Sequence, residues 1–355
     1  MNVRRQAWRA MVASGISLVV VGSGVFVPAG AAVKTVQPSS LSRGANPAIA
    51  YLVRDVIHDG AARVTATHRG QHQHLWVVDG GYVVQDWLPR HSTYRLVFIG
   101  TGTHAGDKLV IGRSHLDQSA TVSPGGDRIA WTRGPNDLSK RTTVTVSEPA
   151  TGKVVASRTF RWARVLGVTL SRVLLVRRDR PVQEHPTTVW WNHRRHRVTT
   201  IALREAVRAD LPHNRIVVAT GQFDEPAFCN RVAPLSHPRR TLWQSCRWAP
   251  HAWSPDGTKV VATHTYFDDV GTDRWLVLRA DNADRLGHIW GRLDWTALWE
   301  DDQHYLTLAL GDDGMASVIR CTVGGTCERA SRLFDVGKAT AQPNYIAPPV
   351  VLSSN

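Results

Sequence analysis

The sequence lacks the short motifs by which many enzyme classes are recognised. It has no Gly-x-Ser-x-Gly, no His-Glu-x-x-His, no phosphate-binding glycine loop and no dinucleotide-binding fingerprint. It also has no Cys-x-x-Cys pair, which disfavours redox and zinc chemistry. The sequence therefore predicts no catalytic residue, no metal site and no cofactor, although a site assembled from distant loops would leave no such motif.

Long apolar runs are also scarce, and one occurs, from Ala10 to Val27. Three arginines precede it and small residues follow it, which is the order of regions in a secretory signal peptide. We expect a signal peptide over residues 1–31, with cleavage after Ala31 or Ala32; a retained membrane anchor is the alternative. No later run reaches membrane length, so the sequence predicts a secreted, extracytoplasmic chain with no transmembrane segment after cleavage.

Cysteine is limited to four residues, all in the last third of the chain. An even number in an exported chain predicts two disulfides, for which three pairings are possible. We predict that sequence neighbours pair, as Cys229–Cys246 and Cys321–Cys327. Two glycines lie between the last two cysteines and favour a tight turn, which would set those cysteines opposite each other. Residues 234–240 read as a loop between the strands that carry the first two.

Lysine is scarce, with six residues among 43 basic ones, yet the formal net charge is +14 and remains +11 without the three arginines of the signal peptide. Such an excess favours contact with phosphate-bearing envelope polymers, lipid headgroups or nucleic acid. Export makes nucleic acid an unexpected physiological partner. No long basic run occurs, so arginines scattered over a solvated surface are the plain alternative.

Helical periodicity is nearly absent, and only residues 203–211 have the pattern of a short helix. Elsewhere short stretches of Val, Ile, Leu, Thr and aromatic residues alternate with Gly, Pro, Asp and Asn, which predicts an all-β chain. Similar strand segments recur after 44, 43, 44 and 45 residues, around Ile129, Val173, Ile216, Val260 and Tyr305. A period of about 40 to 45 residues with four strands each is typical of a β-propeller blade.

A local motif accompanies the period. Residues 253–262 read Trp-Ser-Pro-Asp-Gly-Thr-Lys-Val-Val-Ala, which resembles the repeat motif of TolB-type, WD-like propellers. Residues 123–130 repeat it with Gly125 in the place of Asp, and residues 299–305 keep the Trp and an acidic position. The resemblance implies that the turn leads into the innermost strand of a blade. We therefore interpret the motif residues as structural rather than catalytic: Ser123, Pro124, Gly126, Trp253, Ser254, Pro255, Asp256, Gly257 and Trp299.

The repeat covers nearly all of the chain after the signal peptide. We predict a β-propeller of seven blades, each of about four antiparallel strands, over residues 46–335; six blades are the alternative. Segments 48–53, 63–66 and 75–78 are expected to form a shorter first blade. Residues 32–45 are expected to be a flexible lead, and residues 336–355 a tail that could return as a closing strand. The expected state is a monomer.

Tryptophan is abundant, and seven of the 14 lie between Trp243 and Trp299. Most are expected to fill the wedges between blades. Trp248 and Trp295, in expected loops before innermost strands, are candidates for an exposed platform that binds a sugar or a peptide. A second candidate is the basic turn at residues 192–197, whose His193, Arg194, Arg195 and His196 could bind an anion.

His72 and His74 are considered as metal ligands, since alternate residues share one face of a strand. No carboxylate or cysteine is adjacent, so no metal site is predicted there. The preferred function is a non-enzymatic scaffold that binds a protein or an anionic envelope polymer, which the TolB-type resemblance supports by analogy. The alternatives are a glycan-binding propeller and a propeller enzyme, such as a lyase or a hydrolase, with its site at the central channel.

Overall fold

A computed structural model of the chain describes residues 35–66, 71–91, 93–114, 120–134, 141–179, 186–220, 229–265, 272–337 and 350–354. The predicted signal peptide, residues 1–31, lies outside the described residues. Across those ranges, no helix combines the length and the apolar character needed to cross a bilayer.

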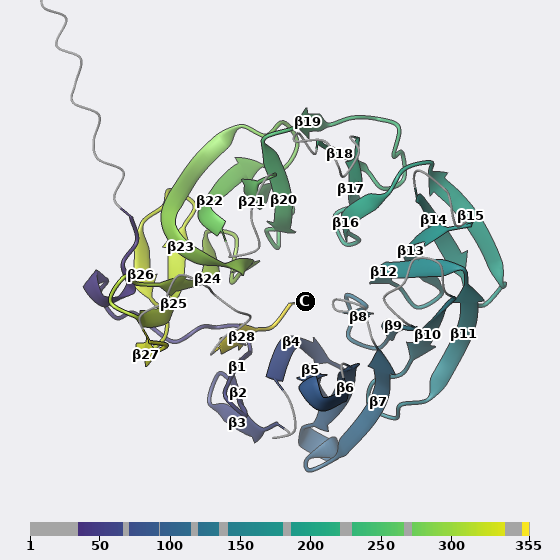
Figure 1. Cartoon of the computed structure of the whole chain (residues 1–355), viewed down its shortest axis with the longest axis horizontal. Helices are drawn as coiled ribbons and strands as arrows, with labels where there is room; N and C mark the ends of the chain where they lie inside the picture. The colour runs from purple at the N-terminus through teal and green to yellow at the C-terminus, as the bar shows by residue number, and fades with distance from the viewer. Residues whose placement is uncertain are drawn as a thin grey trace, which may run out of the picture. The chain divides into compact units, whose positions relative to one another are not determined.

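Residues 35–355 form antiparallel sheets that follow one another around a central axis (Figure 1). Blade 1 consists of β28 (Val350–Leu352), β1 (Tyr51–Val53), β2 (Val56–Asp59) and β3 (Ala62–Thr65). Blade 2 consists of β4 (Gln71–Val78), β5 (Gly81–Leu88), β6 (Thr93–Gly100) and β7 (Lys108–Ser114). Blade 3 consists of β8 (Ala120–Val122), β9 (Ile129–Arg133), β10 (Thr142–Ser147) and β11 (Val154–Phe160).

Blade 4 consists of β12 (Trp162–Val168), β13 (Arg172–Arg178), β14 (Thr187–Asn192) and β15 (Arg197–Ala202). Blade 5 consists of β16 (Ala206–Asp210), β17 (Arg215–Ala219), β18 (Asn230–Pro234) and β19 (Trp243–Ser245). The next sheet contains β20 (Trp248–Trp253), β21 (Lys259–His264), β22 (Thr272–Arg279), β23 (Arg285–Trp299), β24 (His304–Leu310), β25 (Met315–Thr322), β26 (Cys327–Arg329) and β27 (Phe334–Asp335).

This last sheet is two blades that share one long strand. The first part of β23 pairs with β22 and completes blade 6, whereas its second part pairs with β24 and begins blade 7. β26 and β27 both pair with β25 and together form the outer edge of blade 7. The propeller therefore has seven blades, as predicted. Three short 3-10 turns complete the described structure: η1 (Pro38–Ser40), η2 (Pro89–His91) and η3 (Gly102–His104).

The second strand of each blade explains the sequence period. Ile129, Val173, Ile216, Val260 and Tyr305 are all fully buried and all face the preceding blade. The residue after each of them faces the following blade, because side chains alternate along a strand. Burial on both faces accounts for the unbroken apolar runs. These strands are second from the axis. The sequence analysis expected the Ser-Pro-Asp-Gly turn to lead into the innermost strand, and this expectation was wrong. The turn follows the innermost strand and leads into the second one.

The ring closes between the two ends of the described unit. β28 pairs antiparallel with β1, with Val351 opposite Leu52, and thereby supplies the innermost strand of blade 1. Ser354 N donates to Leu75 O of blade 2 at 2.9 Å. The sequence predicted that residues 75–78 belong to a shorter first blade, and this prediction was wrong. Leu75 belongs to β4 of blade 2, because the C-terminal strand β28 provides the fourth strand of blade 1.

Two further expectations from the sequence were wrong. Residues 206–210, within the expected short helix, form the strand β16, since Ala206 must pack between blades 4 and 5. Residues 35–45, within the expected flexible lead, are held against the propeller. Val36 N donates to Trp290 O at 2.7 Å, and Gly44 N donates to Arg329 O at 2.8 Å. These bonds pair the lead with exposed strand edges of blades 6 and 7.

The two predicted disulfides are present. Cys321 and Cys327 lie opposite each other in the β25–β26 hairpin and are bonded. Cys229 and Cys246 are bonded immediately beyond the β18–β19 pairing. Both links therefore join strands that are already neighbours within one blade.

The motif residues form hydrogen-bonded turns. Lys259 N donates to Ser254 Oγ at 3.0 Å, and Thr258 N donates to Asp256 Oδ1 at 2.9 Å. Burial would raise the pKa of Asp256, but hydrogen bonds from Ser254, Thr258 and Lys259 outweigh burial and lower it. In blade 3, Ser123 Oγ donates to Asp127 Oδ1 at 2.7 Å. These contacts bind the turn to itself.

Ring closure by β28 yields a stability prediction. Val351→Asp would place a charge between blades 1 and 2, where Val351 is 6% exposed, and should lower the free energy of unfolding by at least about 2 kcal/mol. Val154→Asp is the matched control on the outer strand β11, where the side chain is 57% exposed; its effect should stay within about 0.5 kcal/mol. Urea unfolding of both variants measures the difference. Equal losses would contradict the closing role of β28.

Candidate functional site

Bulges on the inner strands shape the region around the axis. The inner strands β4, β12, β16, β20 and β23 each have a shift in pairing register. The extra residues are Gln73, Leu166, Val207, His251 and the segment 294–296. A bulge breaks the alternation of side chains and re-aims its neighbours. The bulges therefore lie on the strands nearest the axis, and polar residues stand beside them.

Three basic or imidazole side chains lie on the bulged inner strands of three consecutive blades. Arg164 lies on β12, Arg208 on β16 and His251 on β20. Arg164 Nη2 donates to Glu205 Oε1 at 2.8 Å and to Ala206 O at 3.1 Å. Burial and the charge of Arg164 lower the pKa of Arg208 to about 10. Burial and the charge of Arg208 hold the pKa of His251 well below its usual range, so His251 is neutral at pH 7.

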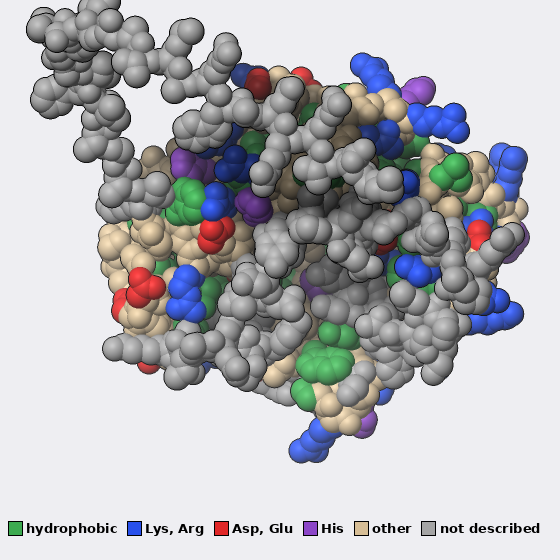
Figure 2. Space-filling view, turned by 45° about the horizontal axis from the view of Figure 1, so that its top comes forward, with side chains coloured by type: hydrophobic (Ala, Val, Ile, Leu, Met, Phe, Trp, Pro, Cys, Tyr) green, Lys and Arg blue, Asp and Glu red, His purple; other side chains and the backbone are tan. Residues whose placement is uncertain are grey.

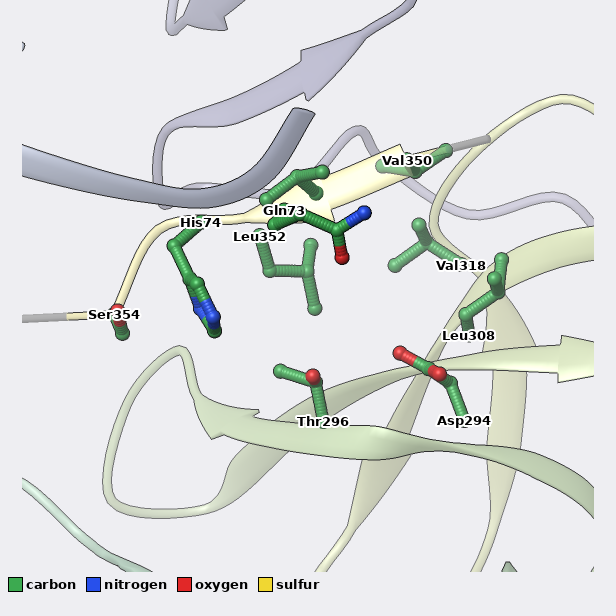
Figure 3. A pocket seen from close by; sticks show the side chains of 10 residues that line it. Gln73, His74, Asp294, Thr296, Leu308, Val318, Val350, Leu352 and Ser354 are labelled. Carbon is green, nitrogen blue, oxygen red and sulfur yellow. The ribbon is translucent and has the colours of Figure 1, made fainter. Parts of the chain in front are cut away.

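A polar cavity lies where the closing strand meets blades 2 and 7 (Figure 3). Asp294 and Thr296, from the bulge of β23, project into it, and His74 of β4 and Ser354 beyond β28 lie on its other side. Leu308 and Val350 are among its apolar lining residues. The cavity therefore combines a carboxyl, a hydroxyl and an imidazole with an apolar wall.

Asp294 is the acidic group of this cavity. Burial raises its pKa, and this effect outweighs the opposing hydrogen bonds from Trp295 and Thr296 and the charge of His74. The cavity volume is about 40 Å³, which admits water, whereas pockets for small molecules usually measure about 300 to 1,000 Å³. The cavity is therefore large enough for a water molecule but too small for a sugar ring.

His72 and His74 are separated by the bulge at Gln73 and do not share a face, contrary to the expectation from the sequence. His72 is buried, and its ring nitrogens lie 2.6 Å from Asp86 Oδ1 and 3.1 Å from Asp55 Oδ1. Arg95 Nη2 donates to Asp86 Oδ2 at 2.7 Å. Two carboxylates thus face one imidazole and one guanidinium in a largely buried network.

The network sets the protonation of His72. Burial would lower its pKa, but hydrogen bonds and charge interactions with Asp86 and Asp55 outweigh burial and raise it. The network holds blades 1 and 2 together, since Asp55 belongs to the β1–β2 turn and the other three groups to blade 2. Within the described ranges, no group of three or more His, Cys, Asp or Glu is arranged to hold a metal ion.

The two candidate tryptophans are strand residues and not loop residues. Trp248 begins β20, where the Arg247 guanidinium lies 4.7 Å from its ring centroid and the His264 ring lies edge-on at 5.4 Å. Trp295 lies in the bulge of β23 and is half-buried. Each ring is thus partly covered, and the two do not line one common cavity. Their role as a binding platform stays a prediction.

An open hollow of about 450 Å³ lies on blade 3. Trp131, Thr143 and Thr145 line it together with Arg133 and Val154. Trp131 is only 7% exposed, so its ring offers little face for a sugar to stack on. The hollow therefore gives weak support to the glycan-binding alternative.

The basic turn at residues 192–197 joins β14 and β15. Arg194, Arg195 and His196 are exposed, whereas His193 is 3% exposed and packs edge-on against Trp191. Burial and the charge of Arg194 lower the pKa of His193. His193 is therefore a core residue of blade 4 rather than part of the exposed anion-binding loop expected from the sequence.

Sequence reasoning missed the channel residues. Arg208 lies in a segment whose pattern resembled a helix. Asp294 stands between the apolar residues Leu293 and Trp295. A lone charged residue in an otherwise apolar inner strand is the available signal for Asp294. Nothing in the local pattern indicates that Arg164, Arg208 and His251 lie near one axis.

No protein-family model matches the chain, and no curated protein matches it. A chain in the crystal structure of the Mitotic Checkpoint Complex is 11% identical and aligns over 94% of this chain and 90% of its own, with a TM-score of 0.50. The β-propeller domain of the Trilobed protease from Pyrococcus furiosus is 12% identical over 73% and 83%, with a TM-score of 0.47. TolB from Acinetobacter baumannii is 14% identical over 67% and 62%, with a TM-score of 0.43. The first of these likenesses shows the fold alone, and it agrees with the β-propeller that the strand pairing establishes.

The His72 network predicts a pH-dependent stability. Folded His72 holds its proton more tightly than unfolded His72, so its contribution is fully present below about pH 6.5 and is lost as the pH rises through the raised pKa. The stability difference between the wild type and His72→Gln should therefore shrink from pH 5.5 to pH 8.5, as measured by urea unfolding. The exposed His91→Gln is the control and should show a constant difference. A His72→Gln difference that grows with pH would refute the assignment.

Proposed function

We propose that the chain is an exported, non-enzymatic β-propeller scaffold that binds an anionic envelope polymer through blade 4. The observation that carries this proposal is the charge of that blade. Residues 161–204 contain ten arginines and only two acidic residues. A charge excess of this size attracts polyanions over a range set by the ionic strength.

The outer hairpin of blade 4 presents part of this charge to solvent. Arg194, Arg195 and Arg197 are exposed within six residues of chain. Arg195 N donates to Asn192 Oδ1 at 2.9 Å, and Arg158 of blade 3 donates to His196 O at 2.9 Å. These bonds fix the turn, so the arginines project from an ordered base. Lys and Arg side chains gather along the right-hand rim in Figure 2, the side on which Figure 1 places blades 3 and 4.

Export is supported by the cysteines. Each disulfide lies within a single blade, and disulfides persist in oxidising compartments outside the cytosol. A signal peptide over residues 1–31 fits this location, and a retained anchor is the competing reading. A secreted polymer binder needs no cofactor, and none is proposed.

An acidic protein is the competing partner for the same rim. Polymer binding is favoured because Arg194, Arg195 and Arg197 stand together on a polar turn of a segment with ten arginines and two acidic residues. The propeller-enzyme alternative would use the channel, where the cavity beside Asp294 is too small for a sugar ring.

Charge reversal of the rim tests the proposal. The variant Arg194→Glu/Arg195→Glu/Arg197→Glu should bind a poly(glycerol phosphate) polymer about 100-fold more weakly, since each arginine near an anionic surface contributes about 1 kcal/mol. Wild-type binding should also weaken as the salt concentration rises. Cosedimentation with the immobilised polymer measures both effects.

The matched control carries the same change in net charge on another part of the ring. Arg279→Glu/Arg285→Glu/Arg332→Glu alters three exposed arginines of blades 6 and 7 and should retain most of the affinity. Equal losses in both variants would show that net charge alone drives binding. Retained polymer binding by the blade 4 variant, or binding only to acidic protein, would overturn the proposal.

A further inference from the structure

We propose that the hollow on blade 3 binds a small polyol that carries one oxyanion, a phosphate or carboxylate group. The hollow lies on the face of blade 3 that is turned toward blade 2, because Trp131 of this face belongs to the buried cluster between those two blades. Blade 4 packs on the opposite face of blade 3. The site is therefore separate from the proposed polymer-binding rim and does not depend on it.

The floor of the hollow is a row of side chains that runs across three strands. Thr145 of β10 lies opposite Trp131 of β9 and opposite Ser157 of β11. Directly paired residues of neighbouring strands point to the same face of a sheet, so these three side chains stand side by side. The next row on this face begins with Arg133, which lies opposite Thr143. All five residues line the hollow.

The outer strand of blade 2 fixes the position of this floor. A Cβ on Gly112 of β7 would lie 2.5 Å from Trp131 Cζ2, so the indole lies directly against the backbone of blade 2. A Cβ on Gly152, in the β10–β11 turn, would lie 2.7 Å from a methyl group of Leu109 in the same strand. β7 thus packs against blade 3 beside the hollow and holds Trp131 in place.

Two polar groups of the hollow have no partner in the described part of the chain. Thr145 is 7% exposed, and its hydroxyl makes no hydrogen bond with any residue that the structure describes. Arg133 is exposed and has neither an ion pair nor a side-chain hydrogen bond within the same ranges. In contrast, Thr143 Oγ1 lies 3.0 Å from Thr159 Oγ1 and is hydrogen-bonded to it. A guanidinium and a hydroxyl are thus available to a ligand.

These groups select the chemistry of the ligand. A guanidinium binds two oxygens of a phosphate or a carboxylate with parallel N–H donors. Serine and threonine hydroxyls both donate and accept hydrogen bonds, so they match the hydroxyl groups of a polyol. Neither Asp nor Glu is among the described residues that line the hollow. No carboxylate of that lining therefore repels an anion or competes for Arg133.

The size of the hollow suits a small molecule. Its volume of about 450 Å³ lies within the range of about 300 to 1,000 Å³ that is usual for ligand pockets. Val154 supplies an apolar wall. Trp131 presents too little of its ring for a sugar to stack on, so binding depends on the guanidinium and the hydroxyls.

Calorimetric titration of the full chain tests the site. The probe is sn-glycerol 3-phosphate, at an ionic strength held constant with potassium chloride, and the wild type should bind it saturably. Arg133→Gln should lower the affinity at least about tenfold, since a charge-assisted hydrogen bond is lost. Thr145→Val removes the hydroxyl and nearly keeps the size of the side chain, and it should lower the affinity about two- to tenfold.

Two further variants serve as controls. Arg279→Gln removes an exposed arginine of β22 and should bind the probe as the wild type does. Arg133→Lys keeps the charge without the two-donor fork and should bind the probe with intermediate affinity. Equal affinities of the wild type and Arg133→Gln would overturn the proposal.

Titrations with glycerate and glycerol identify the ligand class. Glycerate carries a carboxylate in place of the phosphate, so the anion that binds more tightly names the oxyanion. Glycerol has no charge and should bind at least about tenfold more weakly than that anion. The proposal fails if glycerol binds equally well, or if neither anion binds the wild type saturably.

The hollow and the rim are tested separately. The blade 4 charge-reversal variant should bind glycerol phosphate as the wild type does, and Arg133→Gln should still sediment with the polymer. Each proposal can therefore fail while the other stands. Loss of glycerol phosphate binding in the blade 4 variant would contradict a separate site in the hollow.

Discussion

The apolar contact between neighbouring blades is the interaction on which the rest of this structure depends. Each of seven buried clusters contains residues from two adjacent blades, and the last of them joins blade 7 to blade 1. A blade that is buried on both faces needs a largely apolar second strand. That requirement recurs once per blade, so the chain repeats it at intervals of 43 to 45 residues.

The turns that follow the innermost strands link the blades a second time. Asp79 N of blade 2 donates to Gly126 O of blade 3 at 3.1 Å, and His213 Nε2 lies 2.8 Å from Pro255 O across blades 5 and 6. Gly126 and Gly257 both have positive φ, and a Cβ on either would collide with the turn of the preceding blade. The motif glycine thus allows both the positive φ of the turn and the close contact with the preceding blade. The complete motif is therefore a sign of close contact between turns.

The sequence was sufficient for the features that repeat or that are local. The all-β propeller and its seven blades follow from apolar spacing, and the two disulfides follow from the turn or loop that lies between neighbouring cysteines. The innermost strands were misjudged because their pairing contains bulges, which no local pattern of His72–His74 or residues 203–211 reveals. Closure by β28 depends on contact between distant ends of the chain. The channel residues were missed because their proximity arises only when the ring forms.

Regular pairing of the inner strand and charged residues on the inner strand occur in different blades. The inner strands of blades 1 and 3 pair with their neighbours without a register shift, and β28 must do so because it joins the two ends of the ring. The bulged inner strands lie in blades whose hairpins are continuous in sequence, so the chain itself keeps the strands together where a ladder hydrogen bond is lost. Charged side chains can therefore approach the axis on blades 2 and 4 to 7 without weakening closure. This division places Arg208 and Asp294 on bulged strands and leaves the closing strand with the apolar residues Val350 and Leu352.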